Sequence, residues 1–402
     1  MNLGLVTTWY PAGGGYVSKA YRRILEQEHQ VFIYARSGKR YKGHPDWDDP
    51  RVTWASSHYM TTGIWAWHFR QWIRRHNLQM IIFNEQRHWL PLRVAREMGV
   101  IIGAYVDYYR QDTVSAFRAY DFLFCNTQRH FSVFSWHPNC FYIPWGTDIN
   151  IFKPCEEKVK RPVTFLLSAG WEFRWEYDRR GTILALEAFQ KVQGECKLLV
   201  YSQVPIEHIR PKWRDLLLND KRIEIRTGTF DPFPYTEADV YVYPSRLDGI
   251  GLTLPEAVSS GLATIVTDSP PMNEFTVKNE TGLCVEVEKY LGRIDGYYWA
   301  ESISSVQQLA NAMQFYIDRP DILAQHKQSA RRFAEKKLNW EQNAKDINQI
   351  IERTQRLDVP KTILSLLAPL DRQGYVSPFR RTGSFVRALL HAYIKFPQKK
   401  VY

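Results

Sequence analysis

The 402-residue sequence lacks several features that would place it in particular protein classes. No run of about 18 apolar residues occurs, so a membrane-spanning helix is not expected. Residues 1–8 have no basic leader and are expected to form a buried strand rather than a signal peptide. The five cysteines include no close pair in the sequence, which argues against a zinc site or a disulfide framework. These absences favour a cytoplasmic protein.

The sequence has fewer acidic than basic residues, with 42 Asp and Glu against 53 Lys and Arg, and its net charge is +11. No nucleic-acid recognition motif accompanies this charge, so nucleic acid is not the expected partner. A Trp-rich basic stretch, 64–76, predicts a helix, for which packing in the core is the simpler interpretation. The tail from Val376 sets apolar residues at helical spacing among basic ones. Such a helix binds an anionic membrane surface or packs on the protein itself.

Apolar residues make up 45% of the chain, enough for more than one core. Short β-branched and aromatic runs alternate with helical patterns in both halves, which predicts two doubly wound α/β domains. The segment 144–162, with three prolines and a charge cluster, is the best candidate for the linker between them. Strands are expected near 2–8, 31–35, 80–83, 101–106, 122–125, 141–143, 163–168, 197–201, 223–226, 240–243, 263–266 and 283–286.

The most informative segment is 243–257, in which Asp248 and Glu256 flank a turn that contains two glycines. A strand ends just before the turn, and a helix is expected to follow with Thr253 as its N-cap. The turn therefore lies at the carboxyl end of a strand and at a helix N-terminus, where backbone amides favour a bound anion. The two carboxylates can accept hydrogen bonds from sugar hydroxyls and from a ribose diol.

Structural roles for the same residues remain open at this point. Thr253 and Glu256 also have the spacing of a capping box, in which Glu256 only satisfies the N-cap amide. An Asp before a Gly, as Asp248 is, most often belongs to a turn.

The segment resembles the signature of retaining glycosyltransferase family 4, in which two Glu flank seven residues. Here Asp248 and Glu256 flank seven residues, with Asp in place of the first Glu. Several ordered motifs are more specific than one. Further blocks similar to those of the family occur in the same order at 142–154, 178–189, 256–268, 273–283 and 339–341, so that the resemblance extends over residues 1–355.

The resemblance implies the GT-B architecture, with two Rossmann-like domains facing a central cleft. Residues 1–152 would form the acceptor-side domain and 153–338 the donor domain. A late helix, 339–358, would return toward the first domain, and 359–402 would be a basic amphipathic tail. The implied activity is transfer of a sugar, with retention, from a nucleoside-diphosphate sugar to a saccharide or lipid-linked acceptor. No metal or cofactor is implied, and the expected setting is bacterial surface polysaccharide or glycolipid synthesis, in the cytoplasm or at the inner face of the plasma membrane.

The resemblance also implies site residues in the donor domain. Arg180, and with it Arg174, would hold the diphosphate, while Asp248 would contact the sugar and Glu256 the ribose. Phe230 would lie near the base. Backbone around the turn would complete the donor site, through Gly249, Ile250, Gly251 and Leu252. The sequence departs from the family at Asp248, at Gly170-Trp171 and at Pro270-Pro271.

In the first half, polar residues follow the expected strands. The glycine-rich turn with Gly14 and Gly15 is nearly a dinucleotide fingerprint, and in the resembled family it faces the donor phosphates. An ordinary strand-to-helix turn is the alternative. Asp107 is the first choice for a catalytic cleft residue, with Glu85 and Tyr109 as acceptor-side candidates. As alternatives, the two carboxylates cap helices or pair with neighbouring arginines.

Three other functions fit parts of the sequence. The departures from the family pattern are compatible with a degenerate glycosyltransferase that binds a glycan or a nucleotide sugar without turnover. The N-terminal glycines, with Arg36 at the next strand end, are compatible with an NADP-linked oxidoreductase. Nucleic-acid binding rests on charge alone.

Overall fold

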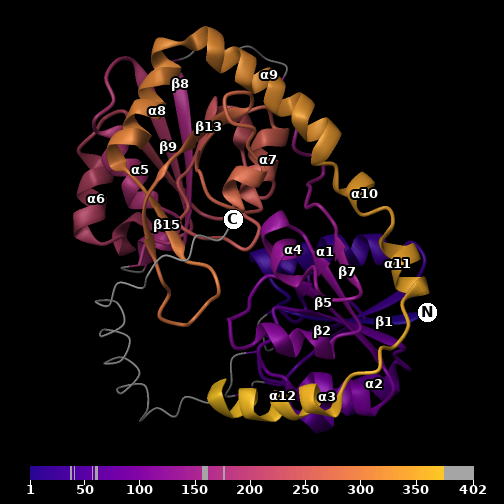
Figure 1. Cartoon of the computed structure of the whole chain (residues 1–402). Coiled ribbons are helices and arrows are strands. Elements are labelled where there is room, and N and C mark those ends of the chain that lie inside the picture. The colour runs from indigo at the N-terminus through magenta and orange to yellow at the C-terminus, as the bar shows by residue number, and fades with distance from the viewer. Residues whose placement is uncertain are drawn as a thin grey trace.

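The computed structural model describes residues 1–36, 39, 41–56, 58, 62–155, 162–174 and 177–374. The middle of the expected linker and the tail from Val376 lie outside these residues. The described chain forms two α/β domains, one above the other in Figure 1.

The N-terminal domain is built on a parallel sheet with the strand order β3-β2-β1-β4-β5-β6-β7. Its strands are β1 (Asn2–Thr7), β2 (Gln30–Ala35), β3 (Val52–Trp54), β4 (Met80–Asn84), β5 (Ile101–Val106), β6 (Phe122–Cys125) and β7 (Cys140–Tyr142). Its helices are α1 (Gly13–Leu25), α2 (Ala66–Arg75), α3 (Leu90–Glu97), η1 (Val114–Ala119) and α4 (Gln128–Phe134).

The C-terminal domain repeats this layout with the strand order β10-β9-β8-β11-β12-β13. Its strands are β8 (Val163–Gly170), β9 (Cys196–Ser202), β10 (Ile223–Thr227), β11 (Val240–Tyr243), β12 (Ala263–Thr267) and β13 (Gly282–Val285). Its α-helices are α5 (Thr182–Phe189), α6 (Pro211–Leu218), α7 (Thr253–Ser259), α8 (Val306–Asp318) and α9 (Pro320–Lys337). Its short 3-10 helices are η2 (Glu172–Arg174), η3 (Ile206–His208), η4 (Tyr235–Glu237) and η5 (Met272–Glu274). An antiparallel pair, β14 (Val287–Leu291) and β15 (Glu301–Ser304), is inserted before α8.

Both sheets have the doubly wound order, in which the direction of winding reverses beside the first strand. Ligands of such sheets bind outside the carboxyl ends of the strands at this reversal, here β1 with β4 and β8 with β11. All the expected strands are present within two residues of the expected bounds, so the fold prediction is confirmed. The strand β3 and the β14–β15 pair are not among the strands expected from the sequence.

Alternation along the strands divides the apolar residues between the two faces of each sheet. In β1, Leu3 and Leu5 face the helices α1 and α11, whereas Val6 faces α2, α3 and α12. In β8, Leu166 faces α7 and α9, whereas Phe165 and Leu167 face α5, α6 and α8. The core that contains Leu3 and Leu166 is continuous between the domains.

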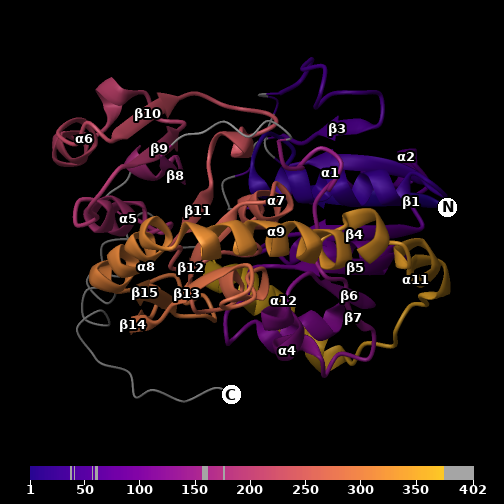
Figure 2. The same cartoon turned by 90° about the horizontal axis from the view of Figure 1, so that it is seen from above.

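The chain crosses back to the N-terminal domain through α10 (Trp340–Asn343) and α11 (Ile347–Arg353), as both views show (Figure 1, Figure 2). The Trp340 ring lies 4.6 Å from that of Trp145, and the Asn348 amide donates to the Ile24 carbonyl at 3.0 Å. A further helix, α12 (Lys361–Gly374), packs on α3 and η1, where Leu367 is fully buried. The residues that follow the C-terminal domain therefore help to join the two domains.

Candidate active site

The loop from β11 to α7 carries the two carboxylates singled out in the sequence. Helix α7 begins at Thr253, its N-cap is Leu252, and it has no side-chain cap. The expected N-cap at Thr253 is wrong, because Leu252 already has helical dihedral angles and the Thr253 hydroxyl accepts a hydrogen bond from Tyr241 at 2.8 Å. The capping box is therefore not formed, and Glu256 is left for another role.

Glu256 lies in the first turn of α7 and accepts a hydrogen bond from the Tyr235 hydroxyl at 2.7 Å. Burial raises the pKa of Glu256 to about 7. A carboxylate in this state readily accepts hydrogen bonds from a ligand's hydroxyls, since each one favours the charged form.

Asp248 lies at the other end of the loop, and its carboxylate already has three donors. It accepts hydrogen bonds from the Tyr243 hydroxyl at 2.5 Å and the Gly249 amide at 2.9 Å, and it pairs with the Arg179 guanidinium at 3.1 Å. Burial favours the neutral acid, but Arg179 and Arg180 outweigh it and lower the pKa of Asp248 below its usual value. Asp248 is thus ionised and holds the loop in place.

The backbone between these two carboxylates has a conformation that lets a ligand approach it closely. Gly251 has φ of +83°, which a residue with a side chain rarely adopts, and a Cβ there would lie 3.2 Å from the Tyr243 hydroxyl. Ile250 is buried at 4% exposure and anchors the loop in the core, while Leu252 is partly buried. The loop leads into the α7 N-terminus, where backbone amides favour an anion.

Arg180 lies across the β8–β11 switch point from this loop. Its guanidinium donates to the Ser168 carbonyl at 3.3 Å and lies 3.6 Å from the position of a Cβ on Gly170. Its positive charge favours the ionised forms of Asp248 and of Tyr235, the tyrosine that donates to Glu256. Arg174 ends η2 with an exposed side chain.

In the N-terminal domain, Asp107 follows β5 and Glu85 follows β4. The Tyr105 hydroxyl donates to one Asp107 oxygen at 3.1 Å, and the other oxygen is buried with no hydrogen-bond partner among the described residues. Burial, and then repulsion by Glu85, hold the pKa of Asp107 well above its usual value. Glu85 has φ of +50°, a strained conformation typical of functional sites, and pairs with Arg87 at 3.2 Å.

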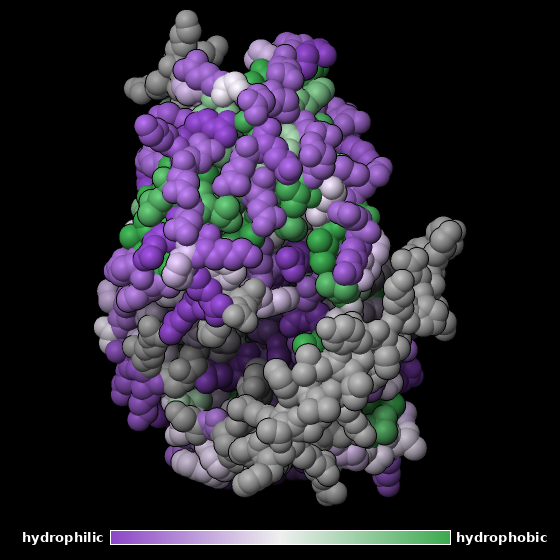
Figure 3. All heavy atoms as spheres, turned by 90° about the vertical axis from the view of Figure 1, so that its left-hand side faces the viewer, coloured by the Kyte–Doolittle hydropathy of each residue, from purple (hydrophilic) through white to green (hydrophobic). Residues whose placement is uncertain are grey.

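Asp107 faces the donor loop of the other domain. A Cβ on Gly249 would lie 3.6 Å from the Asp107 Cβ, so the carboxyl ends of the two sheets meet at this point. A recess lined by hydrophilic residues opens about midway along the molecule in the space-filling view (Figure 3). Both domains therefore supply side chains to one site.

Comparisons with known proteins agree with this arrangement. Residues 169–296 match the family model described as Glycosyl transferases group 1. The matched residues lie in the C-terminal domain and include the loop from β11 to α7. The whole chain is similar to a glycosyltransferase from Rickettsia africae, with a TM-score of 0.69 and 14% identity over 88% of this chain and 99% of that one. A comparison with curated proteins gives no significant match.

Two further structures show the same fold. Anabaena HepE in complex with UDP and glucose has a TM-score of 0.68 and 12% identity, over 88% of this chain and 99% of HepE. WaaG, a glycosyltransferase involved in lipopolysaccharide biosynthesis, has a TM-score of 0.62 and 14% identity, over 87% of this chain and 99% of WaaG. These likenesses confirm the GT-B fold expected from the sequence, and residues 169–296 lie in its C-terminal domain.

The N-terminal glycines lie within the first turn of α1 rather than before it. Gly14 lies beside Asn84, whose amide donates to the Gly14 carbonyl at 2.9 Å. A Cβ on Gly15 would lie 2.1 Å from the Tyr10 carbonyl oxygen, so packing alone requires this glycine. Arg36 donates to the carbonyl of Glu85 and is thereby directed into the protein, which leaves little support for an NADP phosphate site.

Two predicted ligand contacts already contact other side chains of the protein. Tyr109 is only 1% exposed, and its hydroxyl already bonds to Trp299 and His130, so it has no free face for an acceptor. Phe230 is 37% exposed and packs against Tyr201, with ring centroids 4.8 Å apart.

Several residues of the site were missed in the sequence. Arg179 pairs with Asp248, whereas the family motif points to the neighbouring Arg180 because of its position before Gly181. Tyr243 was expected only as the last residue of a strand, and Tyr235 was not among the expected site residues. Arg129 and His130 come from α4 of the N-terminal domain and bond to the backbone of the donor loop, a contact that no local pattern encodes.

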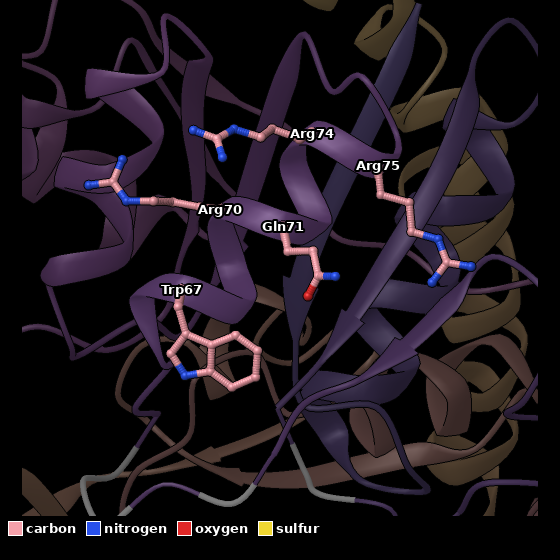
Figure 4. Close-up of a pocket in the computed structure, with 5 residues that line it drawn as sticks. All are labelled: Trp67, Arg70, Gln71, Arg74 and Arg75. Carbon is pink, nitrogen blue, oxygen red and sulfur yellow. The ribbon is translucent and has the colours of Figure 1, made fainter.

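Other polar features lie outside this site. Asp46 and Asp48 have an Asp-x-Asp spacing, but Asp48 accepts hydrogen bonds from the Trp54 indole at 2.7 Å and the Gly43 amide at 2.6 Å. Within the described parts of the chain, His, Cys, Asp and Glu side chains form no group of three able to hold a metal ion. A surface hollow lies on α2, lined by Trp67, Arg70, Gln71, Arg74 and Arg75 (Figure 4).

Proposed function

We propose that the protein is a retaining glycosyltransferase of family 4 that needs no metal ion or cofactor. Its donor is a nucleoside-diphosphate sugar, and its acceptor is a saccharide or a lipid-linked saccharide. The observation that carries this proposal is the approach of Asp107 to Gly249, because it brings a buried carboxylate of one domain against the anion-binding loop of the other. Anabaena HepE, which has the same fold, was solved with UDP and glucose.

In this proposal Glu256 accepts hydrogen bonds from the ribose, near Phe230 and the base. Arg180, together with Arg174 and the amides of residues 249–252, stabilises the charge that develops on the diphosphate. Asp248 lies beside the sugar and fixes the loop through Arg179. On the side of the N-terminal domain, Gly14 and Gly15 at the α1 N-terminus lie beside the phosphates.

The reaction follows a same-face path. The bond between the anomeric carbon and the phosphate oxygen breaks, and the nucleoside diphosphate leaves with the electron pair. The acceptor hydroxyl oxygen attacks from the same face, and its proton passes to the departing phosphate oxygen. Asp107, with Glu85 beside it, orients the acceptor hydroxyl. Contact between the domains excludes water and limits hydrolysis of the donor.

The proposed setting is bacterial surface polysaccharide or glycolipid synthesis at the cytoplasmic face of the membrane. Arg70, Arg74 and Arg75 project from α2 around the hollow of Figure 4, and Trp67 beside them is 64% exposed. A basic surface with an exposed Trp suits an anionic bilayer. No helix within the described ranges is both long and apolar enough to span a bilayer.

The test is release of nucleoside diphosphate from UDP-, GDP- and ADP-sugars in the presence of bacterial lipid and oligosaccharide extracts. One donor should be consumed, and Arg180→Ala should lower its rate about 100-fold, as expected when a charge-stabilising donor is lost. The anomeric configuration of the product, measured by NMR, should match that of the donor. Trapping a covalent glycosyl adduct on Asp248 would refute the same-face path. Binding of a nucleotide sugar without turnover would instead identify a degenerate binding protein, an alternative favoured by the three donors already on the Asp248 carboxylate.

A further inference from the structure

The β14–β15 hairpin extends from the C-terminal domain to the N-terminal domain. Its loop extends from the upper toward the lower domain in Figure 1 and docks on the segment after β5. The Tyr297 hydroxyl donates to the Asp107 carbonyl at 2.9 Å, and the Tyr298 amide donates to the Tyr109 carbonyl at 3.0 Å. The hairpin is therefore hydrogen-bonded to the backbone at and beside the proposed acceptor-side residue Asp107.

A chain of hydrogen bonds continues from this hairpin back to the donor loop. The Trp299 indole N–H lies 2.6 Å from the Tyr109 hydroxyl, which lies 3.0 Å from Nδ1 of His130. Nε2 of His130 lies 3.1 Å from the Gly249 carbonyl oxygen. We call these four residues, Trp299, Tyr109, His130 and Gly249, the interdomain relay.

Chemistry at the two ends fixes the direction of every bond in the relay. The indole N–H can only donate and the Gly249 carbonyl can only accept. The Tyr109 hydroxyl therefore accepts from Trp299 and donates to Nδ1 of His130, so that Nε2 carries the proton and donates to Gly249. Burial lowers the pKa of His130 well below its usual value, which agrees with this neutral form.

The relay crosses between the domains twice, because Trp299 and Gly249 belong to one domain and Tyr109 and His130 to the other. The adjacent Arg129 adds a second connection, since its guanidinium donates to the backbone carbonyls of Pro270 and Asp248. Arg129 is only 4% exposed. Any separation of the domains breaks these bonds and frees the backbone of residues 248–249.

We propose that the interdomain relay and Arg129 are positioning elements that complete the donor loop only when the two domains are in contact. The side chains of Asp248, Tyr243 and Arg179 hold the loop from within its own domain, and the relay holds its backbone from the opposite domain. A donor sugar would therefore meet a fully ordered loop only after the acceptor-side domain has closed. The consequence for catalysis rests on the proposed function, whereas the mechanical coupling does not.

Hydrogen exchange measured by mass spectrometry tests the coupling in the full chain without any ligand. Tyr109→Phe removes the central hydroxyl, and amides of residues 244–253 should exchange about 5-fold faster, the factor expected when one buried hydrogen bond is lost. The matched control is Tyr316→Phe, which removes an equally buried Tyr–His hydrogen bond, 2.8 Å to His326, outside the relay. This control should leave exchange in residues 244–253 unchanged.

Equal exchange in the two variants, whether both rise or neither does, would overturn the proposal. If Tyr109→Phe does not fold, Trp299→Phe provides the same test, because it removes the indole donor and keeps an aromatic ring at a partly exposed position. Binding of UDP separates this proposal from the proposed function. Loss of the exchange effect with UDP binding intact would refute the relay alone, and absence of nucleotide binding with the exchange effect intact would refute the function alone.

Discussion

Replacing Glu256 with Gln tests the electrostatics of the donor site, because burial raises the pKa of this carboxyl to about 7. A raised pKa means that the folded protein favours the neutral acid. The stabilisation is therefore complete below the unfolded-state pKa of about 4.5 and is lost as the pH rises through 7. The shift corresponds to at most about 3 kcal/mol in the free energy of unfolding. Glu256→Gln stays neutral at every pH and should not suffer this loss.

The assay is thermal unfolding of wild type and Glu256→Gln from about pH 5 to about pH 8.5. The melting temperature of the variant should rise relative to that of wild type as the pH increases. Glu335→Gln changes a carboxylate whose side chain is 49% exposed, and it should follow the wild-type profile. A difference between Glu256→Gln and wild type that stays constant over this range would refute a raised pKa of Glu256.

Three further predictions concern binding and stability. Binding of UDP near pH 7 should release up to about half a proton, because ribose hydroxyls favour the charged form of Glu256. Calorimetry in two buffers of different ionisation enthalpy measures this proton release. Proton uptake on binding would contradict the prediction. Gly15→Ala places a Cβ 2.1 Å from a backbone oxygen and should lower the free energy of unfolding by about 1–3 kcal/mol. The control Gly13→Ala places a Cβ with nothing within 4 Å and should leave the melting temperature unchanged in the same thermal unfolding experiment. Arg96→Met leaves the fully buried Asp121 without its partner at 2.8 Å and should cost about 3–5 kcal/mol in denaturant unfolding; a cost below about 1 kcal/mol would show that the pair is dispensable.

The fold could be predicted because local patterns determine it. The strands of both sheets are short β-branched and aromatic runs, and their alternation with helices leaves few arrangements other than two doubly wound domains. The loop between β11 and α7 could also be placed, because its glycines and the following helix are local features. The strand β3 was missed because its three residues stand between Arg51 and the small residues Ala55 and Ser56, whereas the equally short β7 continues into the apolar Ile143.

The contacts within the site could be predicted only in part, because many of them join distant segments. Nothing in the sequence around Asp248 shows that Arg179 rather than the sugar occupies its carboxylate. Tyr109 follows a strand, as an acceptor residue would, but the hairpin with Trp299 covers it. That hairpin is an insertion without a clear pattern of its own, so its contact with the other domain becomes apparent only in three dimensions.

The most direct test of the proposed function is thermal stabilisation by UDP, GDP, ADP, their common sugar conjugates and NADPH, measured on wild type, Glu256→Ala and Arg180→Ala. A ligand that binds only the folded state raises the melting temperature according to its concentration relative to its Kd. We predict stabilisation by one nucleoside diphosphate and its sugar conjugate, lost in both variants. Stabilisation by NADPH alone, or by no nucleotide, would contradict the assignment of this site to a nucleotide-sugar donor.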